Sequence, residues 1–233
     1  MGRTKIQTRE RMIEIVIPTL WKSPHIHEML KRYDENDLVS AVHIIDNAKE
    51  FHKHYPNRFP LGKWRVYQPP TYNEWVVNKA WNIGVEACSE QSLIGIVNDD
   101  ILYDTDVFDY ILYFSEKIGI LGMHQDNYTT TEKNYEIIDI PHHNYGWGCA
   151  IFFDKHNWVP VPEELKLYYG DTWQFHMNPV PCKALKGLPM KDSNISATSA
   201  HHELIPVLTE LHKQDMDWWG KNADTNRFNW GNE

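Results

Sequence analysis

The sequence lacks the features of membrane-spanning and disulfide-stabilised proteins. It contains no apolar run of 18 residues, and its first eleven residues are polar and charged, unlike a secretory signal. The three cysteines, Cys88, Cys149 and Cys182, are scattered and do not have the spacing of a zinc–thiolate site. We therefore expect a cytoplasmic protein with no integral membrane contact and no structural disulfides.

Excess positive charge is also lacking. The chain has 23 Lys and Arg residues against 32 Asp and Glu residues, and its formal net charge of −9 disfavours a general polyanion-binding role. One stretch, 47–68, departs from this balance. Its cations are Lys49, Lys53, Arg58, Lys63 and Arg65. Two interpretations remain open for it, a solvated loop or a groove for a phosphate-bearing acceptor.

Aromatic residues, by contrast, are abundant, with ten tryptophans and twelve tyrosines in 233 residues. Most of them are expected in the core, where aromatic rings bury large areas. A late group is dense enough for one or two members to form a stacking floor for a sugar or a nucleobase. It consists of Trp147, Trp158, Trp173, Trp218, Trp219 and Trp230.

The order of the predicted elements indicates an α/β protein. The length fits one domain that buries a core without metals or disulfides. Strands and helices alternate through the first half, which predicts βαβ units and a mostly parallel central sheet flanked by helices. The predicted strands are 13–17, 39–45, 64–67, 93–97 and 118–123, and the predicted helices are 24–33, 72–88 and 105–117. Thr71 and Glu74 form a capping box that places the start of the second helix at residue 72.

The second half is predicted to be mixed. A polar loop at 124–143 precedes a glycine-containing strand at 145–153. A short helix at 162–169 and a helix from 171 to about 178 follow, and the chain after residue 189 has no clear pattern.

The clearest candidates for functional residues lie in the stretch 93–104. An apolar, β-branched run ends abruptly in Asn98-Asp99-Asp100. Carboxylates at the carboxyl end of a buried strand lie where α/β sheets bind ligands. Such oxygen ligands suit Mn²⁺ or Mg²⁺, which would in turn hold a diphosphate. The alternative is that both aspartates only start a turn or cap the next helix.

This segment resembles the Asp-any-Asp region of GT-A fold glycosyltransferases, the nucleotide-sugar enzymes typified by glycosyltransferase family 2. In that family the position often reads apolar-apolar-Asn-Asp-Asp. The resemblance extends over residues 13–176. It implies a single Rossmann-like domain, 1–233, with a nucleotide-sugar-binding half at 13–123 and an acceptor-binding half at 124–233.

The resemblance also implies roles for donor-site residues. Pro18 and Thr19 match the turn that faces the nucleotide, and Asp46 matches the strand-end carboxylate that binds the base or ribose. Asn82, two residues before Gly84, matches an asparagine over the nucleotide. Asp100 is the expected direct ligand of Mn²⁺ or Mg²⁺, with Asp99 beside it or on the ribose. The metal would neutralise charge on the diphosphate leaving group.

On the acceptor side the resemblance implies a floor and a base. Trp147 and Gly148 belong to a segment similar to the family's glycine-rich strand. Asp171 stands where inverting members carry the general base, although one acid is present here where a pair is common. Asp171 as a helix N-cap is the alternative.

Many members of the family add a late histidine as a ligand of the metal or the phosphate. His201 and His202 are preferred for this role because they follow Asp171, and His142 and His143 are the other candidates. The residue spacing does not decide between the two pairs.

We therefore predict a metal-dependent glycosyltransferase that moves a sugar from a nucleotide diphosphate sugar, preferably a UDP-sugar, to a hydroxyl. The acceptor is either a hydroxymethylated base in phage DNA or a glycan or small molecule. A non-catalytic module that binds nucleotide sugars or glycans is one alternative. A nucleotidyltransferase is a weaker one, because residues 18–22 are a poor substitute for a glycine-rich phosphate loop with its Lys or Arg.

Overall fold

The computed structural model describes residues 11–57, 62–71, 74, 76–192 and 205–223, and the structural statements below concern these residues. The strands are β1 (Ile13–Thr19), β2 (Val39–Asp46), β3 (Trp64–Tyr67), β4 (Leu93–Val97), β5 (Ile101–Leu102), β6 (Ile120–Met123), β7 (Glu136–Asp139), β8 (Ala150–Asp154), β9 (Cys182–Lys186) and β10 (Lys191–Asp192). The α-helices are α1 (Ile26–Glu35), α2 (Phe51–His54), α3 (Val77–Ala87), α4 (Val107–Phe114), α5 (Gly170–Met177) and α6 (Ile205–Asn222).

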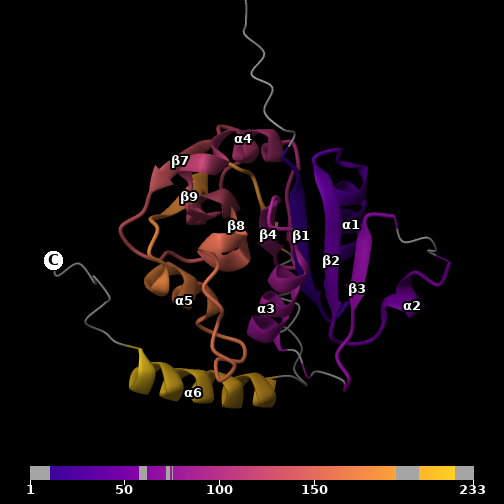
Figure 1. The fold of residues 1–233 in the computed structure, drawn as a ribbon, viewed down its shortest axis with the longest axis vertical. Coiled ribbons are helices and arrows are strands. Elements are labelled where there is room, and N and C mark those ends of the chain that lie inside the picture. Colours follow the sequence, from indigo (N-terminus) through magenta and orange to yellow (C-terminus); the bar gives the residue numbers. More distant parts are fainter. Residues whose placement is uncertain (1–10, 58–61, 72–73, 75, 193–204, 224–233) are drawn as a thin grey trace, which may run out of the picture.

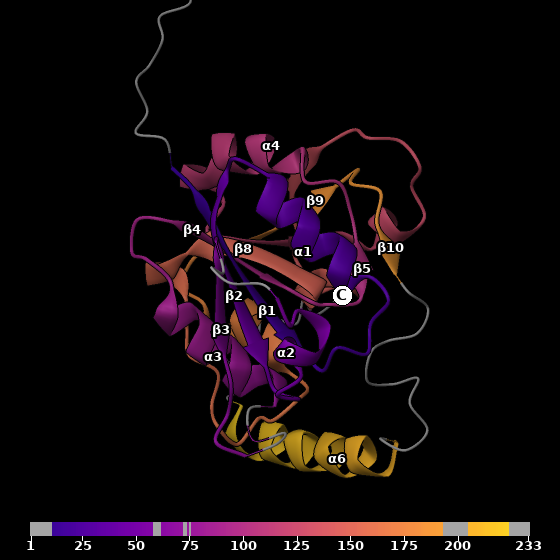
Figure 2. The ribbon, with the colours of Figure 1, turned by 90° about the vertical axis from the view of Figure 1, so that its right-hand side faces the viewer.

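Eight of the strands form one sheet in the order β3-β2-β1-β4-β8-β6-β9-β7 (Figures 1 and 2). Strands β3, β2, β1 and β4 are parallel, and β9 is parallel to β6. Strand β8 runs antiparallel to both of its neighbours, β4 and β6, and the edge strand β7 is antiparallel to β9. The predicted mostly parallel α/β sheet with a mixed second half is therefore confirmed.

Strand β1 lies inside this sheet and is covered on both faces. Ile13, Ile15 and Ile17 join the core cluster that contains residues of α1 and α4. Val16 faces the other way and packs with residues of α3. Burial on both faces explains why the strand is a nearly continuous β-branched run. It also requires a close approach, since a side chain at Gly84 of α3 would overlap Val16.

The start of the second predicted helix is corrected by the structure, because α3 begins at Val77. The Thr71–Glu74 pair does form, with the backbone N–H and hydroxyl of Thr71 donating to Glu74 Oε2 at 3.3 and 2.8 Å. It stabilises a bend before the helix. The first turn of α3 instead bonds to a distant segment, where the backbone N–H of Asn78 donates to the carbonyl of Lys166 at 3.2 Å. A tertiary contact therefore sets this helix end.

Several predictions for the other connections are also wrong. The predicted strand 145–153 divides into a 3₁₀ turn at Trp147–Cys149 and strand β8. Residues 162–169 contain turns and bends but no helix, and the 48–68 stretch contains the short helix α2. Strands β7 and β9 and helix α6 were not predicted. Strands β7 and β9 lie at one edge of the sheet and are only partly buried, which weakens their hydrophobic pattern.

Helix α6 lies across one end of the molecule, beyond α5 and α3 in Figure 1 and beyond α3 in Figure 2. Its anchor is Asp215, whose side chain is fully buried. The carboxylate accepts from three consecutive backbone N–H groups, those of Lys166, Leu167 and Tyr168, at 2.8–2.9 Å. No described helix combines the length and the apolarity that crossing a membrane requires.

We predict that Asp215→Ala destabilises the protein by about 3 kcal/mol, because it leaves three inward-facing N–H groups without their charged acceptor. Urea unfolding measures the change. Asp217→Ala, at an exposed position of the same helix, is the matched control and is expected to be nearly neutral. Equal unfolding midpoints for the two variants would contradict the anchoring role.

Candidate active site

The carboxyl ends of the parallel strands lie at one edge of the sheet, as predicted. Thr19 ends β1 beside Asp46, which ends β2, and Asp99 follows β4 on the other side of β1. The hydroxyl of Thr19 donates to Asp99 Oδ2 at 2.6 Å and accepts from the backbone N–H of Trp21 at 2.8 Å. The turns after β1 and β4 are thus joined by a buried side-chain contact.

The environment of Asp99 disfavours its ionised form. Burial raises the pKa of Asp99 to about 7, with a further rise from the negative charge of Asp100 and an opposing effect from the Thr19 hydrogen bond. Near neutral pH its ionised form is therefore costly in the metal-free protein. A divalent cation beside Asp99 and Asp100 would favour that form. The donor set consists of carboxylate and hydroxyl oxygens, which fits Mn²⁺ or Mg²⁺.

Asp46 is fully buried and is used by the chain itself. Its Oδ1 accepts from the indole N–H of Trp21 at 2.7 Å and from the backbone N–H of Glu50 at 3.0 Å. Its Oδ2 accepts from the side chain of Gln68 at 2.7 Å and from the backbone N–H of Phe51 at 2.9 Å. The carboxylate thus fixes the start of α2 and the ring of Trp21. Its role toward a base or ribose stays a prediction.

Two further residues predicted for the donor site, Pro18 and Asn82, contact other parts of the protein. Pro18 lies within β1, half-buried and paired with Ile45 of β2. Asn82 of α3 holds the 158–161 segment. Its amide donates to the carbonyl of Val161 at 2.8 Å, and its oxygen accepts from the N–H of Val161 at 3.0 Å and the indole of Trp158 at 3.2 Å. A nucleotide contact by Asn82 stays a prediction.

The Asn98-Asp99-Asp100 turn is connected to Asp171 through the 3₁₀ turn at Trp147–Cys149. The backbone N–H of Asn98 donates to the carbonyl of Cys149 at 2.9 Å. On the other side of this turn, a side chain at Gly148 would come within 2.6 Å of Asp171 Oδ2, so only glycine allows the approach. Burial raises the pKa of Cys149 to about 12, and the charges of both Asp100 and Asp171 add to that rise. The carboxylates of Asp100 and Asp171 therefore both lie near Cys149.

Asp171 lies in the first turn of α5, whose N-cap is Tyr169 in a left-handed conformation with φ 62°. The alternative of Asp171 as the N-cap is thereby excluded, although its Oδ1 accepts from the backbone N–H of Thr172 at 2.8 Å. Burial on its own would raise the pKa of Asp171. The hydrogen bond from His143 and the charge of that ring outweigh this effect, and the pKa falls below its ordinary value.

His143 is the residue of this site whose role sequence reasoning missed. Its Nε2 lies 3.0 Å from Asp171 Oδ2, and its ring meets Trp147 and Phe175 edge-on. The available signal was the His142–His143 pair shortly before the Trp147–Cys149 turn, which had suggested a metal or phosphate ligand. His201 and His202, the preferred pair, lie outside the described residues.

The ring of Trp147 is part of the core. It is fully buried, its indole N–H donates to the carbonyl of Lys183 at 2.9 Å, and it packs so closely on Gly122 that no side chain fits there. Stacking of a ligand on Trp147 would require this ring to become exposed, and its role toward a nucleotide sugar stays a prediction. Among the other late aromatics, Trp219 of α6 stacks on Tyr169 with 5.2 Å between ring centroids and an interplanar angle of 16°.

The described cations of the 47–68 stretch contact the chain itself. Lys49 donates to the carbonyl of Pro70, and Lys53 pairs with Glu50 at 2.7 Å. Lys63 donates to the carbonyl of Asn36 at 2.8 Å, and Arg65 donates to the carbonyls of Gly62 and Trp64 at 2.8 and 2.9 Å. Arg58 lies outside the described residues. These contacts do not favour a phosphate-binding groove in the described part of the stretch.

Comparison with known proteins gives no match to a protein-family model and none to a curated protein sequence. Solved structures do resemble the chain. A structure of Staphylococcus aureus TarS residues 1–349 with UDP-GlcNAc has a TM-score of 0.58 and 13% identity, and the match covers 87% of this chain and 66% of that one. GalNAc-T7 with UDP, GalNAc and Mn²⁺ has a TM-score of 0.54 and 10% identity, over 78% of this chain and 43% of that one.

A third similar structure belongs to another class of enzyme. It is 4-diphosphocytidyl-2C-methyl-D-erythritol synthase from Anaerococcus prevotii, with a TM-score of 0.50 and 11% identity, over 89% of this chain and 96% of that one. Identities this low establish the fold and not the activity. The chain has the GT-A fold of nucleotide-sugar glycosyltransferases, as the Asn98-Asp99-Asp100 motif had indicated.

Proposed function

We propose that this protein is a metal-dependent glycosyltransferase that moves a sugar from a UDP-sugar to an acceptor hydroxyl, with Asp171 as the general base. One observation carries the proposal. The Asp99–Asp100 turn and Asp171 contact the same 3₁₀ turn at Trp147–Cys149, on a chain with the GT-A fold. A transferase needs a cation-binding carboxylate and a base near each other, because the diphosphate leaves the same sugar carbon that the acceptor hydroxyl attacks.

The donor would occupy the edge formed by the ends of β1 and β4, within the half of the chain at 13–123. Asp100 would ligate Mn²⁺ or Mg²⁺, and Asp99 would ligate it too or contact the ribose. Bound there, the cation supplies charge neutralisation for the departing diphosphate. The raised pKa of Asp99 supports this placement, since a buried carboxylate without a cationic partner is retained at a cost in stability.

The acceptor would approach Asp171 from the half at 124–233. The His143 contact keeps Asp171 ionised, and the ionised carboxylate is the form that accepts a hydroxyl proton. A hydroxyl of a glycan or small molecule is the acceptor we favour, because the described cations at 47–68 bond to the chain itself. A hydroxymethylated DNA base is the other acceptor, and it requires salt-dependent DNA binding.

The competing functions make different predictions. A nucleotidyltransferase is supported by the fold similarity to the Anaerococcus prevotii synthase and would use the same strand-end carboxylates. It would consume a nucleoside triphosphate and would not require Asp171. A non-catalytic module would bind the donor and release no nucleotide diphosphate. Nucleotide diphosphate released from a panel of nucleotide sugars in the presence of an acceptor identifies the glycosyltransferase, pyrophosphate released from a nucleoside triphosphate identifies the nucleotidyltransferase, and donor binding with neither product identifies the module.

The first prediction concerns the donor site. A UDP-sugar with Mn²⁺ is expected to raise the melting temperature, since a ligand at about 100 times its Kd stabilises the folded state by about 2.7 kcal/mol. Asp100→Asn should abolish most of the shift, and Asp109→Asn, an exposed position in α4, should retain it. Equal shifts in both variants, or a shift unaffected by EDTA, would contradict the assignment of Asp100.

The second prediction concerns the base. Asp171→Asn is expected to lower kcat by about 10²–10⁴-fold, because it removes the group that accepts the acceptor proton. The donor-dependent melting shift should persist, which shows that the variant is folded and binds the donor. A kcat within a few-fold of that of the unmodified protein would rule out Asp171 as the base.

The third prediction concerns pH. His143→Gln removes the contact that lowers the pKa of Asp171, so the effect of burial is no longer opposed and the pKa rises. The acidic limb of kcat/KM should therefore move to higher pH. His142→Gln, its exposed neighbour, is the matched control and should leave the profile unchanged. Superimposable profiles for the two variants would show that His143 does not act on Asp171.

A further inference from the structure

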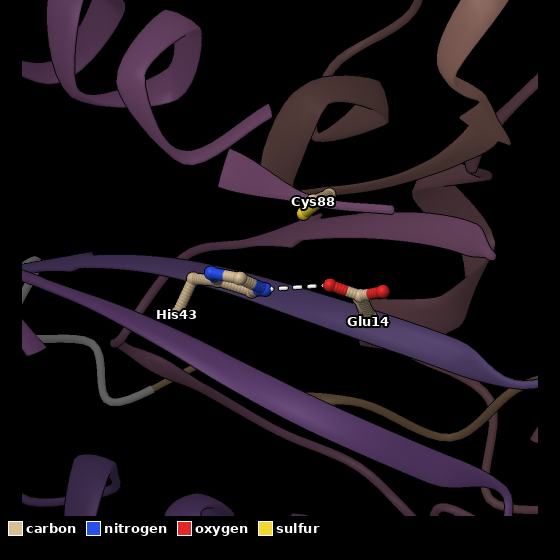
Figure 3. Close-up of side chains that lie close together, drawn as sticks. All are labelled: Glu14, His43 and Cys88. Atoms are coloured by element: carbon tan, nitrogen blue, oxygen red, sulfur yellow. Dashed lines mark hydrogen bonds and ion pairs between the residues drawn. The ribbon is translucent and has the colours of Figure 1, made fainter. Parts of the chain in front are cut away.

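A second cluster of metal-ligating side chains lies away from the candidate active site. It contains Glu14 of β1, His43 of β2 and Cys88, the residue that follows α3. One ligand atom from each of the three lies within 4.8 Å of the other two, and all three residues are buried. Figure 3 shows the sulfur of Cys88 facing the hydrogen bond between Glu14 and His43.

This cluster is distinct from the edge where Asp99 and Asp100 lie. His43 pairs with Val16 of β1, and Glu14 lies two residues before Val16, so both side chains are on the face that α3 covers. Five residues separate Glu14 from Thr19, the end of β1, which corresponds to about 16 Å along an extended strand. A cation held here would not touch a diphosphate at that edge.

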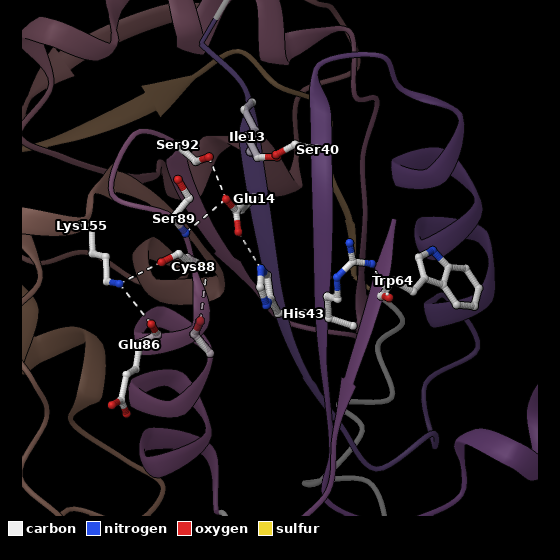
Figure 4. A network of polar contacts seen from close by, with 12 residues as sticks. Ile13, Glu14, Ser40, His43, Trp64, Glu86, Cys88, Ser89, Ser92 and Lys155 are labelled. Carbon is white, nitrogen blue, oxygen red and sulfur yellow. Dashed lines mark hydrogen bonds and ion pairs between the residues drawn. The ribbon is translucent and has the colours of Figure 1, made fainter. Parts of the chain in front are cut away.

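The imidazole and the carboxylate are already oriented by outer contacts. His43 Nε2 lies 2.7 Å from Glu14 Oε2, and its Nδ1 lies 3.1 Å from the hydroxyl of Tyr67. Glu14 Oε1 accepts from the hydroxyl of Ser92 at 2.8 Å and from the backbone N–H of Ser89 at 3.2 Å (Figure 4). Metal-binding side chains typically form such hydrogen bonds through the atom that does not bind the ion, here His43 Nδ1 and Glu14 Oε1. These bonds direct the other atoms, His43 Nε2 and Glu14 Oε2, at the ion.

Contacts with α3 and with Lys155 hold Cys88 in place. Its thiol donates to the carbonyl of Gly84 at 3.2 Å, and Lys155 Nζ bonds the carbonyls of Cys88 and Glu86 at 2.8 and 3.0 Å (Figure 4). The thiol that donates to Gly84 carries a proton in the metal-free protein. A bound cation would take the place of that proton.

The identity of the three ligands selects a metal class. Thiolate, imidazole and carboxylate together suit Zn²⁺, whereas Mn²⁺ and Mg²⁺ prefer oxygen ligands alone. Zinc–ligand distances of about 2.0–2.3 Å place the ligand atoms of a tetrahedral site about 3.3–3.8 Å apart. The cluster therefore needs only side-chain adjustments, in which the Glu14–His43 pair opens and Cys88 approaches.

We propose that Glu14, His43 and Cys88 form a zinc site that ties the end of α3 to β1 and β2. Among the described residues three protein ligands are available, which would leave the fourth position open to water. Binding releases the proton of the Cys88 thiol, and the proton of the Glu14–His43 hydrogen bond gives way to the ion, so that the imidazole carries its proton on Nδ1 toward the hydroxyl of Tyr67. Its structural effect is to stabilise the packing of α3 on the central strands.

The experiment is a titration of the metal-free full-length protein with Co²⁺ as a spectroscopic probe for Zn²⁺. Cobalt bound by Asp99 and Asp100 has oxygen ligands, whereas cobalt at the proposed site has the Cys88 thiolate as a ligand and gives thiolate-to-cobalt charge-transfer absorption. The variants are Cys88→Ser, which keeps the side-chain shape, and His43→Gln. Cys182→Ser is the matched control, because the Cys182 thiol is half-buried and contacts only backbone carbonyls of α5 among its described partners.

We expect a 1:1 charge-transfer band in the unmodified protein and in Cys182→Ser, displaced by Zn²⁺ and absent in Cys88→Ser. His43→Gln should weaken Co²⁺ binding at least about tenfold. Zn²⁺ should also raise the melting temperature of the unmodified protein. Absence of the band from the unmodified protein, or its persistence in Cys88→Ser, would show that the cluster is a buried polar network only. The unmodified protein gives a decisive result even if a variant does not fold.

Discussion

The burial of β1 on both faces is the constraint on which the rest of the structure depends. Because β2 and β4 flank β1 in parallel, the polar residues that end all three strands are brought to one edge. The helices above and below are placed by the same strand. Tyr33 of α1 joins the cluster on one face, and Gly84 of α3 packs on Val16 on the other. A single apolar run therefore positions groups that are up to eighty residues apart, such as Thr19 and Asp99.

The position of Asp171 depends on contacts that are remote in sequence. Gly148 allows the close approach of the 3₁₀ turn, and His143 reaches the carboxylate from the preceding loop. Asp215 of α6 holds the backbone just before Tyr169, whose left-handed conformation starts α5. The candidate base is thus fixed by three separate segments. This arrangement explains how one carboxylate stays ionised at a half-buried site, because its environment includes the His143 ring.

Most of the first half of the fold was predictable because β1, β2 and β4 are largely buried and its helices are amphipathic. The Asn98-Asp99-Asp100 turn was predictable for the same reason, since the end of a buried strand is visible in the sequence. The second half was not. Strands β7 and β9 lie at the sheet edge, and the residues at 147–149 form a turn that depends on Gly148 meeting Asp171. The roles of His143 and of the Glu14–His43–Cys88 cluster arise from tertiary contacts, which residue spacing does not encode.

The most direct test of the central claim is a crystal structure of the protein with UDP and Mn²⁺, in which the anomalous signal of manganese locates the ion. The account predicts a single strong peak beside Asp100, bridging its carboxylate and the diphosphate, with Asp171 open to the space next to the distal phosphate. A manganese peak elsewhere, or UDP bound away from the ends of β1 and β4, would contradict it.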